Sequence, residues 1–89
     1  MRTLVVNVRN EDCDVYIGRG SKWGNPFIIG RDGNRREVIA KFLEYLLLKE
    51  GQYLLQSLDE LRGKRIGCYC APFLCHGDIL ARLCDILNN

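Results

Sequence analysis

Three short stretches of the chain are rich in β-branched and other apolar residues, a composition that favours β-strands. They cover residues 4–8, 13–17 and 66–70. Turn-forming residues separate the first two stretches, whereas some 50 residues with a different pattern precede the third. The sequence therefore predicts two early strands and one late strand.

A helix is predicted over residues 34–48, where apolar positions recur at helical spacing. Asn34 and Glu37 open it in the pattern of a capping box. Its apolar stripe is wider than one face, because Leu47 and Leu48 extend it. This breadth suggests burial on two sides, and a homodimer is one arrangement that would provide it.

Two further helices are predicted, over residues 53–61 and from Cys75 or His76 to about Leu87. The buried stripe of the last helix is expected to contain Ile79, Leu80, Leu83, Ile86 and Leu87. Helices that separate strands favour an α/β domain with parallel pairing. We therefore expect one small layered α/β domain over residues 1–89, with about three or four partly parallel strands and about three helices.

The composition of the chain limits the cellular compartments in which we expect this protein. No apolar run approaches the roughly 20 residues that span a bilayer, and residues 1–8 look like a strand instead of a signal peptide. Five cysteines without a signal peptide argue against a disulfide framework. We expect a cytoplasmic protein without membrane contact, whose thiols serve as core residues, ligands or reactive groups.

Two segments are dense in residue types that regular elements do not need, and each follows a predicted strand. They are Gly18–Phe27 and Cys70–Asp78. In open α/β sheets, ligands bind beyond the carboxyl ends of the strands. The two segments are therefore expected to form opposite walls of one cleft.

The first segment has the chemistry to bind an anion that carries a ring. Arg19 and Lys22 would meet negative charge, and Trp23 would pack on the ring. The alternatives are a solvated charged turn and a core position for Trp23. The candidate ligand-binding residues in this segment are Arg19, Gly20, Ser21, Lys22, Trp23 and Asn25.

The second segment permits three interpretations. A helix N-terminus with His76 and Gly77 would receive an anion. Cys75, His76 and Asp78 would instead be catalytic, with Cys75 leaning toward thiolate at the helix N-terminus. A zinc site is the third interpretation, although its C-x-C spacing is narrow. The zinc ligands would be Cys68, Cys70, Cys75 and His76.

A family resemblance rests on the same two regions. The stretches from Tyr16 to Phe27 and from Gly67 to Asp78 resemble the motifs of domain-of-unknown-function family 4326, small proteins of bacteria and their phages. The resemblance covers nearly the whole chain. It implies a single compact domain and no assigned reaction, and a phage setting would allow host-directed roles.

These observations favour the binding of a small nucleotide-like or phosphorylated ligand in a cleft between Gly18–Phe27 and Cys70–Asp78, with no cofactor and no metal. One alternative is an enzyme that acts on a nucleotide or nucleoside through Cys75, His76 and Asp78. Another is a zinc-stabilised interaction module. Nucleic-acid binding is less favoured, because the net charge is only +2.

Overall fold

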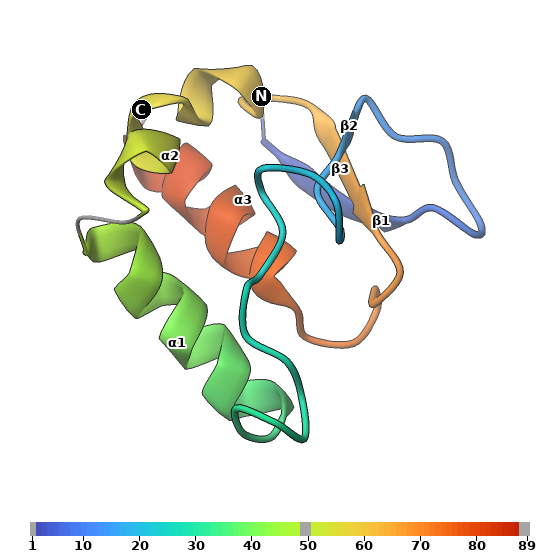
Figure 1. Cartoon of the computed structure of the whole chain (residues 1–89). Coiled ribbons are helices and arrows are strands. Elements are labelled where there is room, and N and C mark those ends of the chain that lie inside the picture. The colour runs from blue at the N-terminus through green and yellow to red at the C-terminus, as the bar shows by residue number, and fades with distance from the viewer. Residues whose placement is uncertain (1, 49–50, 88–89) are drawn as a thin grey trace.

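The computed structural model describes residues 2–48 and 51–87. Figure 1 shows three short strands with the two long helices on one side of them. This is the small layered α/β architecture that the sequence predicts. In chain order the elements are β1 (Leu4–Asn7), β2 (Val15–Tyr16), α1 (Arg35–Leu47), α2 (Gln52–Gln56), the 3₁₀ helix η1 (Leu58–Glu60), β3 (Arg65–Cys68) and α3 (His76–Leu87).

The strands form one sheet in the order β1-β3-β2, and β3 is parallel to both neighbours. The last strand in the sequence is therefore the central one. Leu4 lies opposite Arg65 in the first pair, and Val15 lies opposite Ile66 in the second. Because all three strands run in the same direction, their carboxyl ends meet at one edge of the sheet.

Helix α3 connects the sheet to the rest of the domain. It contacts β1 and β3 on one side, and α1 and η1 elsewhere. This arrangement makes α3 the middle layer between the sheet and α1, as Figure 1 shows. The fully buried side chains that fill these layers are Ile17, Phe42, Leu46, Leu54, Leu61, Ile66, Leu80 and Cys84.

The first turn of α1 confirms the predicted capping box. The Asn34 side chain accepts a hydrogen bond from the Glu37 backbone N–H at 2.9 Å. In return, the Asn34 backbone N–H donates to the Glu37 carboxylate at 2.9 Å. Two backbone donors that the helix cannot satisfy internally are thereby paired.

The predicted apolar stripes extend further than the core does. In α3, Leu80 is buried, but Ile86 and Leu87 are 56% and 60% exposed, which corrects the prediction for that helix. In and just after α1, Leu47 and Leu48 are likewise exposed within the single chain. The helix predicted over 53–61 is in fact two short pieces, α2 and η1, separated at Ser57.

The three strands are shorter than predicted. The connection from β2 to α1 is long, and hydrogen bonds within it order its backbone. Backbone N–H groups of Ser21 and Gly24 donate to the carbonyls of Gly18 and Ser21, both at 3.1 Å. Further along, the Ile28 N–H donates to the Asp32 carboxylate at 2.8 Å. In the described residues no helix is long and apolar enough to cross a membrane.

Asn34→Ala should lower the free energy of unfolding by about 1 kcal/mol, because it removes the side-chain acceptor at the start of α1. Urea unfolding followed by circular dichroism measures the change. Asn34→Asp is the matched control, since it keeps an acceptor at the same position and should remain close to the parent. Equal losses in both variants would contradict a capping role for the side chain.

Candidate functional site

A cavity of about 350 Å³ lies where the two loop segments meet. Its remaining walls come from the ends of β2 and β3 and from the first turns of α1. The segments that the sequence analysis singled out therefore do line one cavity. Their contributions are Gly18, Arg19, Asn25 and Phe27 from the first segment, and Cys70, Leu74, Cys75 and His76 from the second.

The turn after β3 is held in place by the end of β1. The Asn7 side-chain amide donates to the Ala71 carbonyl at 2.8 Å and to the Tyr69 carbonyl at 3.3 Å. The turn also contains a cis peptide bond between Ala71 and Pro72. Asn7 is thus a positioning residue for one wall of the cavity, and no pattern in the sequence predicted this role.

His76 joins the two loop segments directly. Its Nε2 lies 2.8 Å from the Ile17 carbonyl oxygen, and the residue is 8% exposed. Because a carbonyl oxygen can only accept, Nε2 must carry the proton in this contact. The imidazole also packs edge-on against Phe42, with ring centroids 5.1 Å apart. Burial lowers the pKa of His76 below its ordinary value, so the ring favours the neutral form.

Asp78 serves the start of α3. Its carboxylate accepts a hydrogen bond from the Cys75 backbone N–H at 2.9 Å. This contact satisfies one of the free donors at the helix N-terminus. The three candidate catalytic residues, Cys75, His76 and Asp78, lie together at the start of α3. The side chains of His76 and Asp78, however, form their hydrogen bonds with backbone groups.

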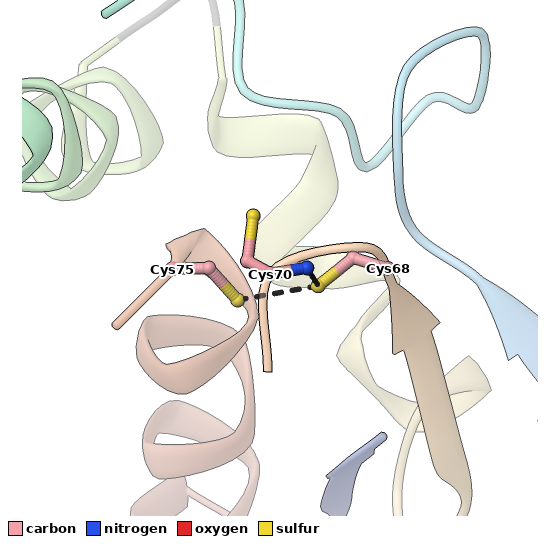
Figure 2. A group of neighbouring side chains, drawn as sticks. All are labelled: Cys68, Cys70 and Cys75. Atoms are coloured by element: carbon pink, nitrogen blue, oxygen red, sulfur yellow. Dashed lines mark hydrogen bonds between the residues drawn. The ribbon is translucent and has the colours of Figure 1, made fainter. Parts of the chain in front are cut away.

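Three thiols gather at the end of β3 and the start of α3 (Figure 2). The sulfur atoms of Cys68 and Cys75 face each other at 3.4 Å, and Cys70 lies beside them. The hydrogen bond from Cys75 lowers the pKa of Cys68, and the same contact together with burial raises the pKa of Cys75. The position of Cys75 at a helix N-terminus predicted that this residue would lean toward the thiolate form. The two pKa shifts favour the thiolate on Cys68 instead.

Arg19 and Asn25 are the polar residues of the first segment that reach the cavity. Arg19 is exposed, and no other residue in 2–48 or 51–87 pairs with its guanidinium. Asn25 is already bonded, since its amide donates to the Val38 carbonyl at 3.1 Å and its oxygen accepts from the Phe27 N–H at 3.0 Å. Arg19 is available to a ligand, whereas Asn25 holds the wall together.

Three other residues predicted to bind the ligand do not line the cavity. Trp23 is only 2% exposed and belongs to the core, as the alternative interpretation held. Lys22 pairs with Glu60 at 2.9 Å, and its Nζ lies 5.2 Å from the centroid of the Trp23 ring. The Ser21 hydroxyl donates to the Gly18 carbonyl at 2.7 Å. These residues shape the turn that presents Arg19.

The two predicted glycines also have backbone roles. Gly20 has a φ of 91°, a conformation that favours glycine, and it forms the turn next to Arg19. Gly77 lies against Val5 of β1 and Ile17, and a Cβ there would come within 2.8 Å of Ile17 Cδ1. Neither glycine lines the cavity, but Gly77 allows α3 to approach the sheet closely.

Arg35 lines the cavity and was missed as a site residue. One guanidinium nitrogen donates to the Leu74 carbonyl at 3.1 Å, and the group lies 5.6 Å from the centroid of the Phe73 ring. The sequence does contain a feature that could have identified Arg35 as a site residue. A positive side chain in the first turn of a helix opposes the helix dipole, so such a residue invites another explanation.

These features define a small parallel α/β domain with a ligand-sized cavity at the carboxyl edge of its sheet. The chain belongs to the family described as Domain of unknown function (DUF4326), which matches residues 5–86. The resemblance inferred from the two motifs is therefore confirmed.

The chain is also similar to two viral proteins. The chain is 42% identical over 86 residues to the "uncharacterized 12.4 kDa protein in nrdA-td intergenic region" of Enterobacteria phage T4, covering 93% of this chain and 78% of that protein. It is 34% identical over 97 residues to "uncharacterized protein R718" of Acanthamoeba polyphaga mimivirus, covering 89% of this chain and 72% of that protein. No solved structure matches the chain.

Because His76 is the single histidine, its imidazole signals in a proton NMR titration are unambiguous. We expect a midpoint below the ordinary value of 6.5. The unfolded chain then binds a proton before the folded chain does as the pH falls. The contribution of this residue to the free energy of unfolding is present above about pH 6.5 and is progressively lost as the pH falls toward the folded-state pKa.

The control is His76→Gln, which has no titrating ring but keeps an N–H for the Ile17 carbonyl. Its free energy of unfolding should decrease less between pH 7 and about pH 5 than that of the parent. A midpoint at or above 6.5 in the parent would contradict burial of the neutral ring.

Proposed function

We propose that this protein binds a small nucleotide-like or phosphorylated ligand in the cavity between Gly18–Phe27 and Cys70–Asp78. The observation that carries the proposal is that two arginines from distant segments, Arg19 and Arg35, line the same cavity. Guanidinium groups suit phosphate and carboxylate oxygens, because their fork of donors forms paired hydrogen bonds. No acidic side chain is among the described residues that line the cavity.

The rest of the cavity suits the less polar part of such a ligand. Phe27, Ile28 and Leu74 contribute apolar surface, and Tyr16 and Tyr69 stand edge to face with ring centroids 6.3 Å apart. Small-ligand sites usually combine apolar walls with a few placed polar groups. Their volumes run from about 300 to 1,000 Å³, so this cavity favours a ligand no larger than about a mononucleotide.

Binding is favoured over the enzyme alternative by the state of the candidate catalytic groups. His76 Nε2 already donates to a carbonyl, and the Asp78 carboxylate already accepts from a backbone N–H. A general base needs a lone pair within reach of the substrate proton. Binding through Arg19 and Arg35 requires no such rearrangement of His76 or Asp78.

A thermal-shift screen with nucleotides, cyclic nucleotides, ADP-ribose derivatives and sugar phosphates tests the proposal. A ligand at about 100 times its dissociation constant adds about 2.7 kcal/mol to the free energy of unfolding and raises the melting temperature. Calorimetric titration of the best ligand then gives its affinity. If none of these compounds shifts the melting temperature, the proposal fails.

Arg19→Gln should weaken binding of that ligand about tenfold or more, because it removes a charged donor from the cavity. Arg36→Gln is the matched control. It makes the same change of charge on the exposed side of α1, one residue from Arg35, and Arg36 does not line the cavity. Equal weakening in both variants would point to a general electrostatic effect and contradict a direct contact.

A further inference from the structure

The grouping of Cys68, Cys70 and Cys75 calls for an explanation of its own. Their three sulfur atoms all lie within 4.8 Å of one another, and all three residues line the cavity. A packing role accounts for Cys68 and Cys75, which are buried, but not for Cys70, which is only half-buried. The cluster therefore places soft ligand atoms at the wall of a cavity.

The spacing of the sulfur atoms is close to that of a metal-thiolate site. A tetrahedral zinc ion with Zn–S bonds of about 2.3 Å holds its sulfur ligands about 3.8 Å apart. Cys68 and Cys75 are 3.4 Å apart, and the third sulfur lies within 4.8 Å of both. Figure 2 shows the sulfur of Cys70 pointing off the line that joins the other two.

Hydrogen bonds hold the backbone around the three cysteines, as is usual around the ligands of metal sites. The Cys70 N–H donates to the Cys68 sulfur at 3.5 Å, and the Cys70 carbonyl accepts from the Phe73 N–H at 2.8 Å. The Cys75 N–H is bound by Asp78, and Asn7 holds the turn between the cysteines. Such outer contacts orient the ligand side chains before the metal arrives.

We propose that Cys68, Cys70 and Cys75 form a three-thiolate site for a thiophilic metal ion, with Zn²⁺ the expected occupant and the fourth coordination position open to the cavity. Thiolates prefer zinc and copper(I) over calcium or magnesium. The three thiols release their protons to solvent as the metal binds. A zinc site with three protein ligands and one open position differs from closed structural sites with four.

His76 is not a ligand of this site, which separates it from the four-ligand zinc site considered from the sequence. Its Nε2 is bonded to the Ile17 carbonyl, and neither ring nitrogen belongs to the sulfur cluster. The open position faces the same cavity as Arg19 and Arg35. Water or an anionic group would complete the coordination there.

Metal analysis of untagged, reduced protein tests this site without any organic ligand, so its outcome is separate from that of the ligand screen. We expect about one zinc per chain by mass spectrometry. Replacement by Co²⁺ should give the sulfur-to-metal charge-transfer absorption and the intense visible bands of a four-coordinate thiolate site. If the reduced protein binds neither Zn²⁺ nor Co²⁺, the proposal is overturned. Formation of a disulfide between Cys68 and Cys75 in oxidised protein would not change that conclusion.

Cys70→Ser is the most informative variant, because this side chain is only half-buried and its loss should leave the fold intact by circular dichroism. We expect it to weaken Co²⁺ binding more than about tenfold and to reduce the charge-transfer band. Cys13→Ser is the matched control, since Cys13 is also half-buried but lies outside the cluster. Unchanged Co²⁺ binding in Cys70→Ser, or an equal loss in Cys13→Ser, would overturn the proposal.

Discussion

The parallel pairing of β3 with both of its neighbours is the constraint on which the cavity depends. Two short strands from the first part of the chain leave a gap that β3 fills from the second part. Because all three run the same way, Asn7, Tyr16 and Cys68 end at one edge. An antiparallel β3 would carry Cys68, and the turn with Cys70 and Cys75 that follows it, to the opposite edge, away from Arg19. The order and direction of only ten strand residues thus determine which loops meet.

Side chains at this edge divide into those that hold the backbone and those that remain available. Asn7 fixes the turn after β3, His76 joins it to the end of β2, and Asp78 caps α3. Each of these groups bonds to a backbone partner, which holds the walls of the cavity in place. The groups at the cavity wall that remain available are the guanidinium of Arg19, the donors of Arg35 that do not bond to Leu74, and the thiols.

Local patterns predicted the parts of the fold that are local in origin. The cap at Asn34 and the start of α3 at His76 follow from residues within one helical turn, so the sequence identified both. The apolar stripe in α3 predicted burial of Ile86 and Leu87, and that prediction was wrong, since periodicity gives the inward face of a helix but not where the neighbouring layer ends.

The same limit applies to the site. Composition marked the two loops, and strand direction explained why they should meet, but neither could tell a stacked Trp23 from a buried one. That difference depends on Lys22 and the core beneath the turn, which are tertiary features. Arg35 and Asn7 lie outside the marked segments, and only the folded chain brings Arg35 to the cavity and Asn7 to the turn that forms one of its walls.

The charges at the cavity link its arginines to its thiols. With the thiols protonated, Arg19 and Arg35 make the cavity positive, and an anion is attracted. Three thiolates without a metal would reverse that sign and repel the same anion. A divalent ion bound to three thiolates leaves a single negative charge, which one arginine can balance while the other meets the ligand. In the proposed site, the affinity of the cavity for an anion would therefore depend on the state of Cys68, Cys70 and Cys75 as well as on the arginines.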